Sequence, residues 1–409
     1  MDTGFSMLDG AKAMYYCHDT FGLGHLRRTL TLANHLRTAA PNLSQLIVTG
    51  SPVASQFGFP EGTDYVKLPS VTKNDAGAYE PRTLSNSEMS SVRDMRSDIL
   101  LSSAHHYQPD VFVVDHAPGG LQGEAIATLR HLKETFPDTK LVIGLRDIMD
   151  DAATVRTSWK REGVYELFDD IYDLILVYGN RNFYDVVQEY GLSQRAAEKT
   201  RFVGYLGRKP GTRTPEAVRA SLDMQTDKLV VVTAGGGGDG RALFEAMLRD
   251  LRIQDQRDFD CLIVGGPLIS EADRSELRTQ LGQRGNVHFL DFTDDLLSYL
   301  GAADAVISMG GYNTVCEILS LNRPAIIVPR VKPRQEQLIR ATVMSDHGLV
   351  QMLHPRDLEP ERLMNSTHDL LANASIKRPQ LNFDGLPNVA SELRSLVAGS
   401  SQNSAPLQF

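Results

Sequence analysis

The chain has 409 residues, of which 42% are hydrophobic and 23% are charged. These proportions are ordinary for a soluble globular protein, and they exclude a disordered chain, a coiled coil and a disulfide-rich scaffold. At roughly 100–200 residues per domain, the length indicates two domains. The formal net charge is −9, from 42 basic and 51 acidic residues, and no basic block predicts nucleic-acid binding.

The cysteines and the apolar segments indicate the compartment. Cys17, Cys261 and Cys316 lie far apart, which excludes a disulfide framework and a cysteine zinc site and is typical of buried thiols in a reducing cytosol. No apolar run reaches the roughly 18–20 residues that a membrane-spanning helix needs. The first twelve residues lack the basic start and apolar core of a signal peptide. We therefore expect a cytoplasmic protein, and peripheral contact with the inner membrane face stays open.

Short apolar runs alternate with helix-like stretches along most of the chain. Such near-continuous apolar runs indicate strands buried on both faces, as in parallel sheets. The predicted strands are 13–17, 46–49, 111–115, 141–145 and 174–178, then 229–234, 261–265, 287–290, 305–309 and 325–329. Helical patterns lie between them at 26–36, 123–135, 241–251 and 314–320. The alternation predicts an α/β protein with two doubly wound, Rossmann-like domains.

A linker composition separates the two halves. Residues 207–217 (GRKPGTRTPEA) contain two prolines, two glycines and three basic residues, so we place the boundary near Pro210. This gives domains at 12–209 and 210–398, followed by a small, polar and disordered tail at 399–409. Ligands of open parallel sheets bind beyond the carboxyl ends of the strands. Two such sheets facing across a cleft would make a site for two substrates.

The loop after the first strand contains the first candidate catalytic residue. Gly22 and Gly24 allow a tight turn, and His25 follows at the start of a helix. A histidine at the mouth of a cleft can act as a general base, because its pKa lies near neutral pH. The alternative is a helix-capping histidine with no chemical role.

An aspartate ends the third predicted strand of the first domain. If Asp115 accepts a hydrogen bond from His25, it fixes the tautomer of the ring and stabilises the imidazolium that forms on proton abstraction. The alternative is a loop-capping aspartate. His18 and Asp19 are a second candidate pair, although adjacent side chains more often diverge than cooperate.

Four consecutive glycines, Gly235, Gly236, Gly237 and Gly238, open the second domain between a strand and a helix. Their backbone amides and the helix N-terminus form an anion site suited to phosphate. The run also satisfies GxGxxG, but a dinucleotide site wants an acidic residue at the end of the next strand, and that strand ends in glycines. It also lacks the lysine of an ATP-binding P-loop. A simple tight turn is the remaining alternative.

A second glycine turn follows the strand at 305–309. Gly310 and Gly311 make this turn, Asn313 or Thr314 can cap the next helix, and Glu317 lies one turn further, where it can accept bonds from a ribose. Farther on, the acid and amide of Glu336 and Gln337 suit sugar hydroxyls, which both donate and accept. The basic side chains between these segments could neutralise phosphate, or they could be solvated; they are Arg330, Lys332 and Arg334.

Taken in order, these motifs resemble the GT-B glycosyltransferases, specifically the family-28 (MurG-like) group and the bacterial proteins described only as predicted glycosyltransferases. The likeness covers most of the chain and is strongest over 229–349. It implies a fold of two Rossmann-like domains, the first for the acceptor and the second for a nucleoside-diphosphate sugar. It also implies that His25 faces the acceptor and that Asp115 orients it.

The resemblance assigns further residues of the second domain. Phe292 and Thr293 would lie along the nucleotide base, and the element SMGGYNTVCE would give Gly311, Asn313 and Thr314 to the diphosphate and Glu317 to the ribose. Glu336 and Gln337 would touch the donor sugar. Arg27, Arg146 and Arg334 are further candidates for contacts with the diphosphate or the acceptor.

The sequence departs from the family in three places, one of which is the pair Arg27 and Arg28 after the first loop, where the family often has apolar residues. MurG, a member of the group, has two glutamines where this chain has Glu336 and Gln337, and its first loop is GGTGGH where this chain has GLGH. These differences argue against the MurG reaction itself and leave the acceptor open: a glycan, a lipid-linked sugar or a small molecule.

We therefore predict an inverting glycosyltransferase that uses a nucleoside-diphosphate sugar, UDP-linked, as co-substrate and needs no metal and no cofactor. Its rivals are a nucleotide-sugar 2-epimerase or hydrolase on the same fold and a non-catalytic nucleotide-sugar-binding subunit.

Overall fold

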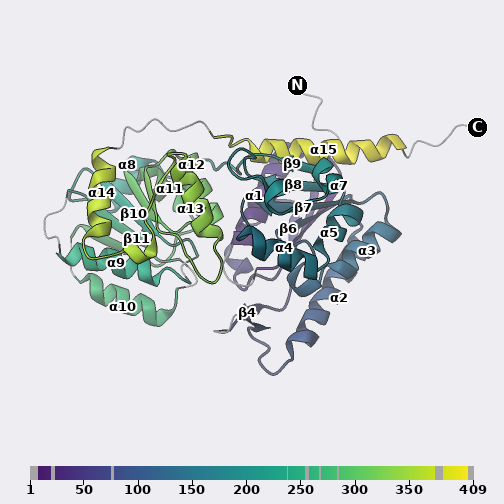
Figure 1. Ribbon diagram of the computed structural model, residues 1–409, viewed down its shortest axis with the longest axis horizontal. Coiled ribbons are helices and arrows are strands. Elements are labelled where there is room, and N and C mark those ends of the chain that lie inside the picture. The colour runs from purple at the N-terminus through teal and green to yellow at the C-terminus, as the bar shows by residue number, and fades with distance from the viewer. Residues whose placement is uncertain are drawn as a thin grey trace, which may run out of the picture. The chain divides into compact units, whose positions relative to one another are not determined.

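A computed structural model describes residues 8–19, 24–74, 78–236, 238–253, 258–266, 269–282, 285–373 and 381–403, with side chains described as far as residue 399. The chain divides into two compact units (Figure 1). The first consists of Met1–Leu206 together with Asn382–Phe409, and the second of Gly207–Leu381. Each is built on a parallel sheet with helices packed against it.

The first unit has a seven-stranded sheet in the order β3-β2-β1-β6-β7-β8-β9, with every neighbouring pair parallel. Its strands are β1 (Lys12–Cys17), β2 (Ser44–Thr49), β3 (Thr63–Lys67), β6 (Val111–Asp115), β7 (Lys140–Arg146), β8 (Leu174–Tyr178) and β9 (Thr200–Phe202). All five residues of β6 are buried, as expected for a strand covered on both faces. Because β1, β6 and β7 are adjacent, their carboxyl ends meet at one place.

Helices of the first unit cover this sheet. They are α1 (Gly24–Ala39), α2 (Met89–Tyr107), α3 (Ile126–Thr135), α4 (Ala152–Arg161), α5 (Val164–Glu166), α6 (Val186–Glu189), α7 (Gln194–Glu198) and α15 (Gly385–Asn403), with shorter turns η2 (Ala54–Gln56), η3 (Leu121–Gly123) and η4 (Leu167–Ile171). One continuous apolar core joins the sheet to α2, α3 and α4.

The second unit has a six-stranded parallel sheet in the order β12-β11-β10-β13-β14-β15. Its strands are β10 (Leu229–Thr233), β11 (Asp260–Val264), β12 (Val287–Leu290), β13 (Ala305–Ser308), β14 (Ala325–Ile327) and β15 (Gln351–Met352). Its helices are α8 (Pro215–Ser221), α9 (Arg241–Ile253), α10 (Glu271–Leu281), α11 (Leu296–Ala302), α12 (Tyr312–Ser320), α13 (Glu336–Asp346) and α14 (Arg362–Ala372), with a 3₁₀ turn η5 (Pro355–Asp357). The predicted strands are therefore present in both units.

The C-terminal segment corrects the predicted division of the chain. Residues from Asn382 onward were expected in the second domain, yet they belong to the first unit. The backbone N–H of Tyr205 donates to Asn382, the N–H of Gly385 donates back to Tyr205, and the Asn388 side chain donates to the Val203 carbonyl at 2.8 Å. Helix α15, yellow in Figure 1, then packs against α1.

Two smaller expectations also change. The tail predicted from Gly399 is helical as far as Asn403, because α15 continues through it, and residues 404–409 lie outside the described part. The predicted linker belongs to the second unit, where Thr212 and Arg213 are held by Asp295 and Ser298 at the start of α11.

The segment between β3 and α2 contains secondary structure of its own. It contains a two-stranded antiparallel sheet, β4 (Val71–Lys73) and β5 (Tyr79–Pro81), before α2 begins. Across the described ranges, no helix combines the length and the apolar character needed to span a membrane.

Candidate functional site

In the first unit, three strand ends bring charged and imidazole side chains together. Asp115 is the last residue of β6, Arg146 is the last residue of β7, and His18 and Asp19 directly follow β1. Helix α1 starts beside them and supplies His25 from its first turn. The sheet order therefore collects at one edge residues that are far apart in the chain.

The predicted contact between His25 and Asp115 is present. Nδ1 of His25 lies 2.6 Å from Oδ2 of Asp115, and the two side chains are 18% and 5% exposed. Because an ionised carboxylate only accepts hydrogen bonds, Nδ1 carries the proton. The lone pair of the ring is then on Nε2, which is the atom that could accept a proton from a substrate.

The surroundings set the charge states of this pair. Burial lowers the pKa of His25 to about 4, although the hydrogen bond to Asp115 acts in the opposite direction. Burial alone would raise the pKa of Asp115, but the Arg28 charge and the His25 hydrogen bond outweigh it and hold that pKa below its usual value. At neutral pH the pair therefore consists of a neutral imidazole and a carboxylate.

Arg28 is a member of this site to which the sequence analysis assigned no role. Its Nε donates to Oδ1 of Asp115 at 2.7 Å, its Nη2 donates to Oδ2, and the residue is only 1% exposed. This is a bidentate arginine–carboxylate pair. Arg28 lies three residues after His25 on α1, so helical spacing, which puts both residues on one face, could have indicated it.

Three other residues surround the ring of His25. Oδ1 of Asp19 accepts the backbone N–H of His25 at 3.2 Å, and burial together with the Asp115 charge raises the pKa of Asp19 to about 7. The ring centroids of His18 and His116 lie 4.3 and 5.1 Å from the centroid of the His25 ring. His18 and Asp19 therefore contact different parts of His25: the His18 ring lies against the His25 ring, and Asp19 accepts the His25 backbone N–H.

The two arginines predicted near this edge occupy different places. Arg146 donates from Nη2 to Nε2 of His116 at 2.8 Å, so it belongs to the cluster around His25. Arg27 lies in the first turn of α1 and is partly exposed. Contacts of either with a diphosphate or an acceptor stay predictions.

In the second unit, the glycine-rich loop after β10 closely approaches the loops after the strands on both sides of it. A Cβ atom on Gly235, whose φ is +68°, would lie 3.1 Å from Oγ1 of Thr314. On the other side, a Cβ on Gly266 would lie 2.6 Å from the Gly235 carbonyl oxygen. Glycine therefore allows these loops to meet with their backbones exposed to a ligand. Gly236 and Gly238 are described in this loop, while Gly237 lies outside the described residues.

The loop after β13 lies at the same carboxyl edge of the sheet, next to the end of β14. A Cβ on Gly310 would lie 2.9 Å from the Gln337 carbonyl oxygen, which brings the start of α12 close to the start of α13. Gly311 is the N-cap of α12 and has no side-chain cap bond. The expectation that Asn313 or Thr314 caps the helix is therefore wrong, because both lie within its first turn.

Most predicted donor residues on α12 and α13 are buried. Asn313 and Thr314 are 8% and 5% exposed, and Glu317 is fully buried on α12. The backbone N–H groups at the start of α12 are the part of this element suited to an anion. The predicted contact of Glu317 with a ribose stays a prediction.

Arg330 joins the predicted sugar pair to the glycine-rich loop. Its guanidinium donates to Oδ2 of Asp239 at 2.9 Å and also to Oε1 of Glu336. Its backbone N–H donates to the side chain of Gln337 at 3.0 Å. Both members of the pair therefore face Arg330, whereas sequence reasoning had treated this arginine only as a possible phosphate contact. Arg334 is half-buried in the loop before α13.

The predicted base-contact residues lie in the loop after β12. Phe292 is 39% exposed, which is unusual for a large aromatic side chain, and Thr293 accepts the backbone N–H of Asp295 at 3.1 Å. Asp295 caps α11 by accepting the backbone N–H of Ser298. A Cβ on Gly265 would lie 3.1 Å from the Asp291 carbonyl oxygen, so this loop adjoins the others along the edge.

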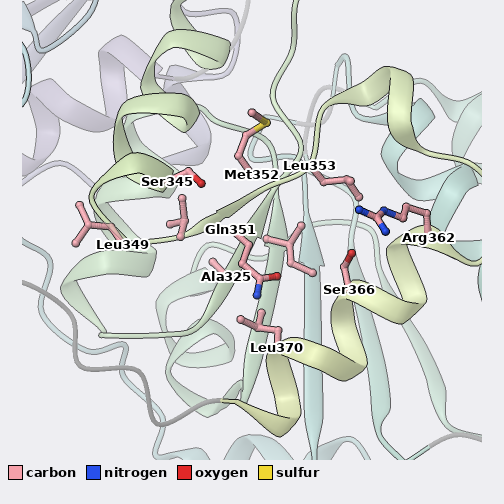
Figure 2. Close-up of a pocket in the computed structure, with 12 residues that line it drawn as sticks. Ala325, Ser345, Leu349, Gln351, Met352, Leu353, Arg362, Ser366 and Leu370 are labelled. Atoms are coloured by element: carbon pink, nitrogen blue, oxygen red, sulfur yellow. The ribbon is translucent and has the colours of Figure 1, made fainter.

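A separate cavity of about 440 Å³ lies in this unit beside the edge strand β15 (Figure 2). Polar side chains in its lining include Ser345, Gln351, Arg362 and Ser366. None of the predicted donor residues lines it, so the carboxyl edge of the sheet remains the candidate donor site. Among the residues that the structure describes, no cluster of three acidic, histidine or cysteine side chains is placed to hold a metal ion.

Comparison with known proteins defines the class first. UDP-GlcNAc 2-epimerase from Methanocaldococcus jannaschii matches 94% of this chain and 99% of its own at a TM-score of 0.57 and 12% identity. MurG from Acinetobacter baumannii matches 95% of this chain and 99% of its own at a TM-score of 0.54 and 12% identity. The likeness covers both units, and the fold is GT-B.

Sequence comparison then shows which family the second unit resembles. Residues 229–385 match the glycosyltransferase family 28 C-terminal domain. A UDP-N-acetylglucosamine–N-acetylmuramyl-(pentapeptide) pyrophosphoryl-undecaprenol N-acetylglucosamine transferase from Haemophilus influenzae is 27% identical over 186 residues, covering 38% of this chain and 52% of the relative. The chain thus spans about half the length of the curated relatives it matches. The second unit therefore carries a family-28 C-terminal domain, and the predicted resemblance of the chain to the family-28 group of GT-B proteins is confirmed.

Proposed function

We propose that this protein is a glycosyltransferase that moves a sugar from a nucleoside-diphosphate sugar, UDP-linked, to a hydroxyl group of an acceptor. The observation that carries the proposal is the hydrogen bond of 2.6 Å between His25 and Asp115, with the ring neutral and Nε2 available. A neutral imidazole oriented by a carboxylate is the arrangement of a general base. It would take the proton as the acceptor oxygen attacks the anomeric carbon.

The second unit supports the donor half of the proposal. The family-28 domain contains the glycine-rich loop, the start of α12 and the Glu336–Gln337 pair, which adjoin along one edge of the sheet. Backbone amides at this edge are suited to the diphosphate, whose negative charge grows as the sugar leaves. In this proposal no metal ion is needed for that stabilisation, and attack opposite the leaving group inverts the anomeric centre.

The relatives indicate the chemical class of the acceptor but do not identify the acceptor molecule. The name of the Haemophilus relative specifies a pyrophosphoryl-undecaprenol acceptor, which is lipid-linked. This chain departs from the MurG pattern in the first loop and at Glu336. We propose a hydroxyl acceptor, whether glycan, lipid-linked sugar or small molecule, reached in the cytoplasm or at the inner face of the membrane.

The test is a panel of UDP-sugars in three arms. Each donor is incubated alone, with acceptor hydroxyls, and with acceptors plus EDTA, and the products are identified by mass spectrometry and anomeric NMR. Transfer that requires an acceptor, persists in EDTA and inverts the anomeric centre supports the proposal. Sugar conversion with donor alone would identify the epimerase or hydrolase alternative, which the fold of the Methanocaldococcus protein keeps relevant. Tight UDP binding without turnover would identify a non-catalytic subunit.

A further inference from the structure

We propose that Arg28 is a positioning residue for the proposed base: it holds Asp115 against His25 and keeps the imidazole uncharged, so that Nε2 remains a proton acceptor in mildly acidic solution. This inference rests on the proposed function for its catalytic meaning. The effect of Arg28 on the protonation of the His25 ring can be measured without any substrate.

The geometry of Asp115 is the first step. In a simple histidine–carboxylate pair, the negative charge of the carboxylate favours the imidazolium. Here Arg28 occupies both oxygens of Asp115, and His25 shares Oδ2 with it. The carboxylate is therefore already paired with a buried cation. It can still orient the ring, but it stabilises a proton on that ring less.

The position of the guanidinium is the second step. Nη2 of Arg28 lies 3.2 Å from Nδ1 of His25, which leaves no room for screening by water. A positive charge at this distance disfavours a second positive charge on the ring. Consistent with this geometry, burial first, and then the charges of Arg28 and Arg146, lower the pKa of His25.

Other groups face the ring from every element around it, and they do not reverse this balance. Asp19 after β1 binds the backbone of His25, and its raised pKa of about 7 makes it a weak source of negative charge below neutral pH. The titratable and charged groups around the ring are His18 and Asp19 after β1, Arg28 on α1, Asp115 and His116 at the end of β6, and Arg146 at the end of β7.

The consequence for catalysis follows from the protonation state. A general base must be unprotonated to act, so the acidic limb of the rate profile reports the pKa of the base in the free enzyme. With Arg28 in place, that limb lies well below neutral pH. Without Arg28, it moves upward, and the enzyme loses activity in mildly acidic solution where the native protein keeps it.

The experiment follows the ring of His25 by NMR in full-length protein labelled with ¹⁵N-histidine. His25 is identified by the resonances that disappear in His25→Gln. The native ring should remain neutral, with its proton on Nδ1, down to about pH 5. In Arg28→Met its titration midpoint should rise by about one pH unit or more, and Arg28→Lys should fall between the two. The neighbouring Arg27→Met is the matched control and should leave the midpoint in place.

Two results would overturn the proposal: a native His25 that titrates near its ordinary pKa, or an Arg28→Met variant with an unchanged midpoint. The first needs no variant, so a poorly folded Arg28→Met protein leaves the test intact. A native-like fold of each variant is checked by circular dichroism. If the ring titrates as expected but no donor supports transfer, the proposed function fails and the role of Arg28 stands. If transfer occurs but the ring titrates near its ordinary pKa, the role of Arg28 fails and the proposed function stands.

Discussion

The two units differ in the kind of group that each places at the carboxyl edge of its sheet: charged side chains in the first and backbone N–H groups in the second. In the first unit the charged groups are side chains. Two arginines, two aspartates and three imidazoles lie at the ends of β1, β6 and β7 and at the start of α1. In the second unit the proposed donors are backbone groups. The glycine-rich loop and the start of α12 offer N–H groups, and Arg330 binds Asp239 beside that loop. Side chains can gain and lose protons, whereas amides hold a fixed dipole.

This difference matches the two tasks in the proposed reaction. Moving a proton needs a group that titrates, and its pKa depends on neighbours that mutation can change one at a time. Holding a diphosphate needs donors that stay in place, and a negatively charged protein can supply them locally without a basic surface. Substitutions in each unit can show whether the two tasks separate as the two units do.

The largest effect is expected for His25→Gln. Loss of a general base typically lowers the rate by about 10²–10⁴-fold, so kcat should fall by that order while the affinity for UDP is unchanged. Steady-state kinetics and calorimetric titration with UDP measure the two quantities. His106→Gln, an exposed histidine on α2 of the same unit, serves as the control and should have native kinetics. If His25→Gln lost UDP affinity as well as kcat, the assignment of nucleotide binding to the second unit and proton transfer to the first would be contradicted.

Gly235→Ala should show the converse pattern. The new Cβ lies close to Thr314 and the backbone has φ +68°, so the loop must shift and UDP affinity should fall by about tenfold. Gly282→Ala is a matched control, because it has nearly the same φ, +64°, and nothing within 4 Å of its Cβ. Both variants should lose about 1 kcal/mol of stability. Equal UDP affinity in the two would show that the glycine-rich loop does not bind the nucleotide.

Arg330→Met separates the sugar from the nucleotide. Arg330 joins Glu336 to Asp239, so its loss frees two carboxylates near the proposed position of the sugar. We expect the affinity for UDP-sugars to fall several-fold more than the affinity for UDP, measured by calorimetry. Arg362→Met in the cavity of Figure 2 should change neither affinity. An equal loss for UDP and UDP-sugars would place Arg330 at the diphosphate instead.

The smallest effect concerns stability and pH at Asp19. Its pKa is raised to about 7 by burial and by Asp115, so between its ordinary pKa and pH 7 the folded protein binds a proton that the unfolded chain has lost. Stability from this group is therefore present at low pH and falls as pH rises, by up to about 1.4 kcal/mol per pH unit. Relative to the native protein, Asp19→Asn should gain stability from pH 4 to 7 in urea unfolding. A difference that stays constant over this range would contradict the raised pKa.

Sequence alone could predict much of this molecule, for identifiable reasons. Apolar runs such as 229–234 predict buried parallel strands because few other structures accept them, and glycine runs between strand and helix predict backbone anion sites. Asp115 could be placed beside His25 because Asp115 ends one strand, His25 lies in the segment after another, and the fold brings these two strand ends together. The predicted strands appear where these patterns indicate, but the edge strands β3, β9 and β15 and the β4-β5 pair were not predicted.

Sequence could not predict the contacts of side chains and segments that have several possible partners in the folded chain. Helical spacing places Arg28 on the same face as His25, but only the folded chain shows that its guanidinium is buried against Asp115. Glu336 and Gln337 looked like a free polar pair, but Arg330 lies against both. The segment after Asn382 has a helical pattern that could cover either sheet, and its hydrogen bonds with Val203 and Tyr205 determine which.

Hydrogen–deuterium exchange with and without UDP tests most directly the claim that nucleotide binding belongs to the second unit and proton transfer to the first. We predict that UDP slows exchange in peptides covering 234–240 and 310–315, equally in the native protein and in His25→Gln, with no change in peptides covering 24–30. Protection of the segment around His25 in place of the glycine-rich loop, or protection that disappears in His25→Gln, would contradict this claim.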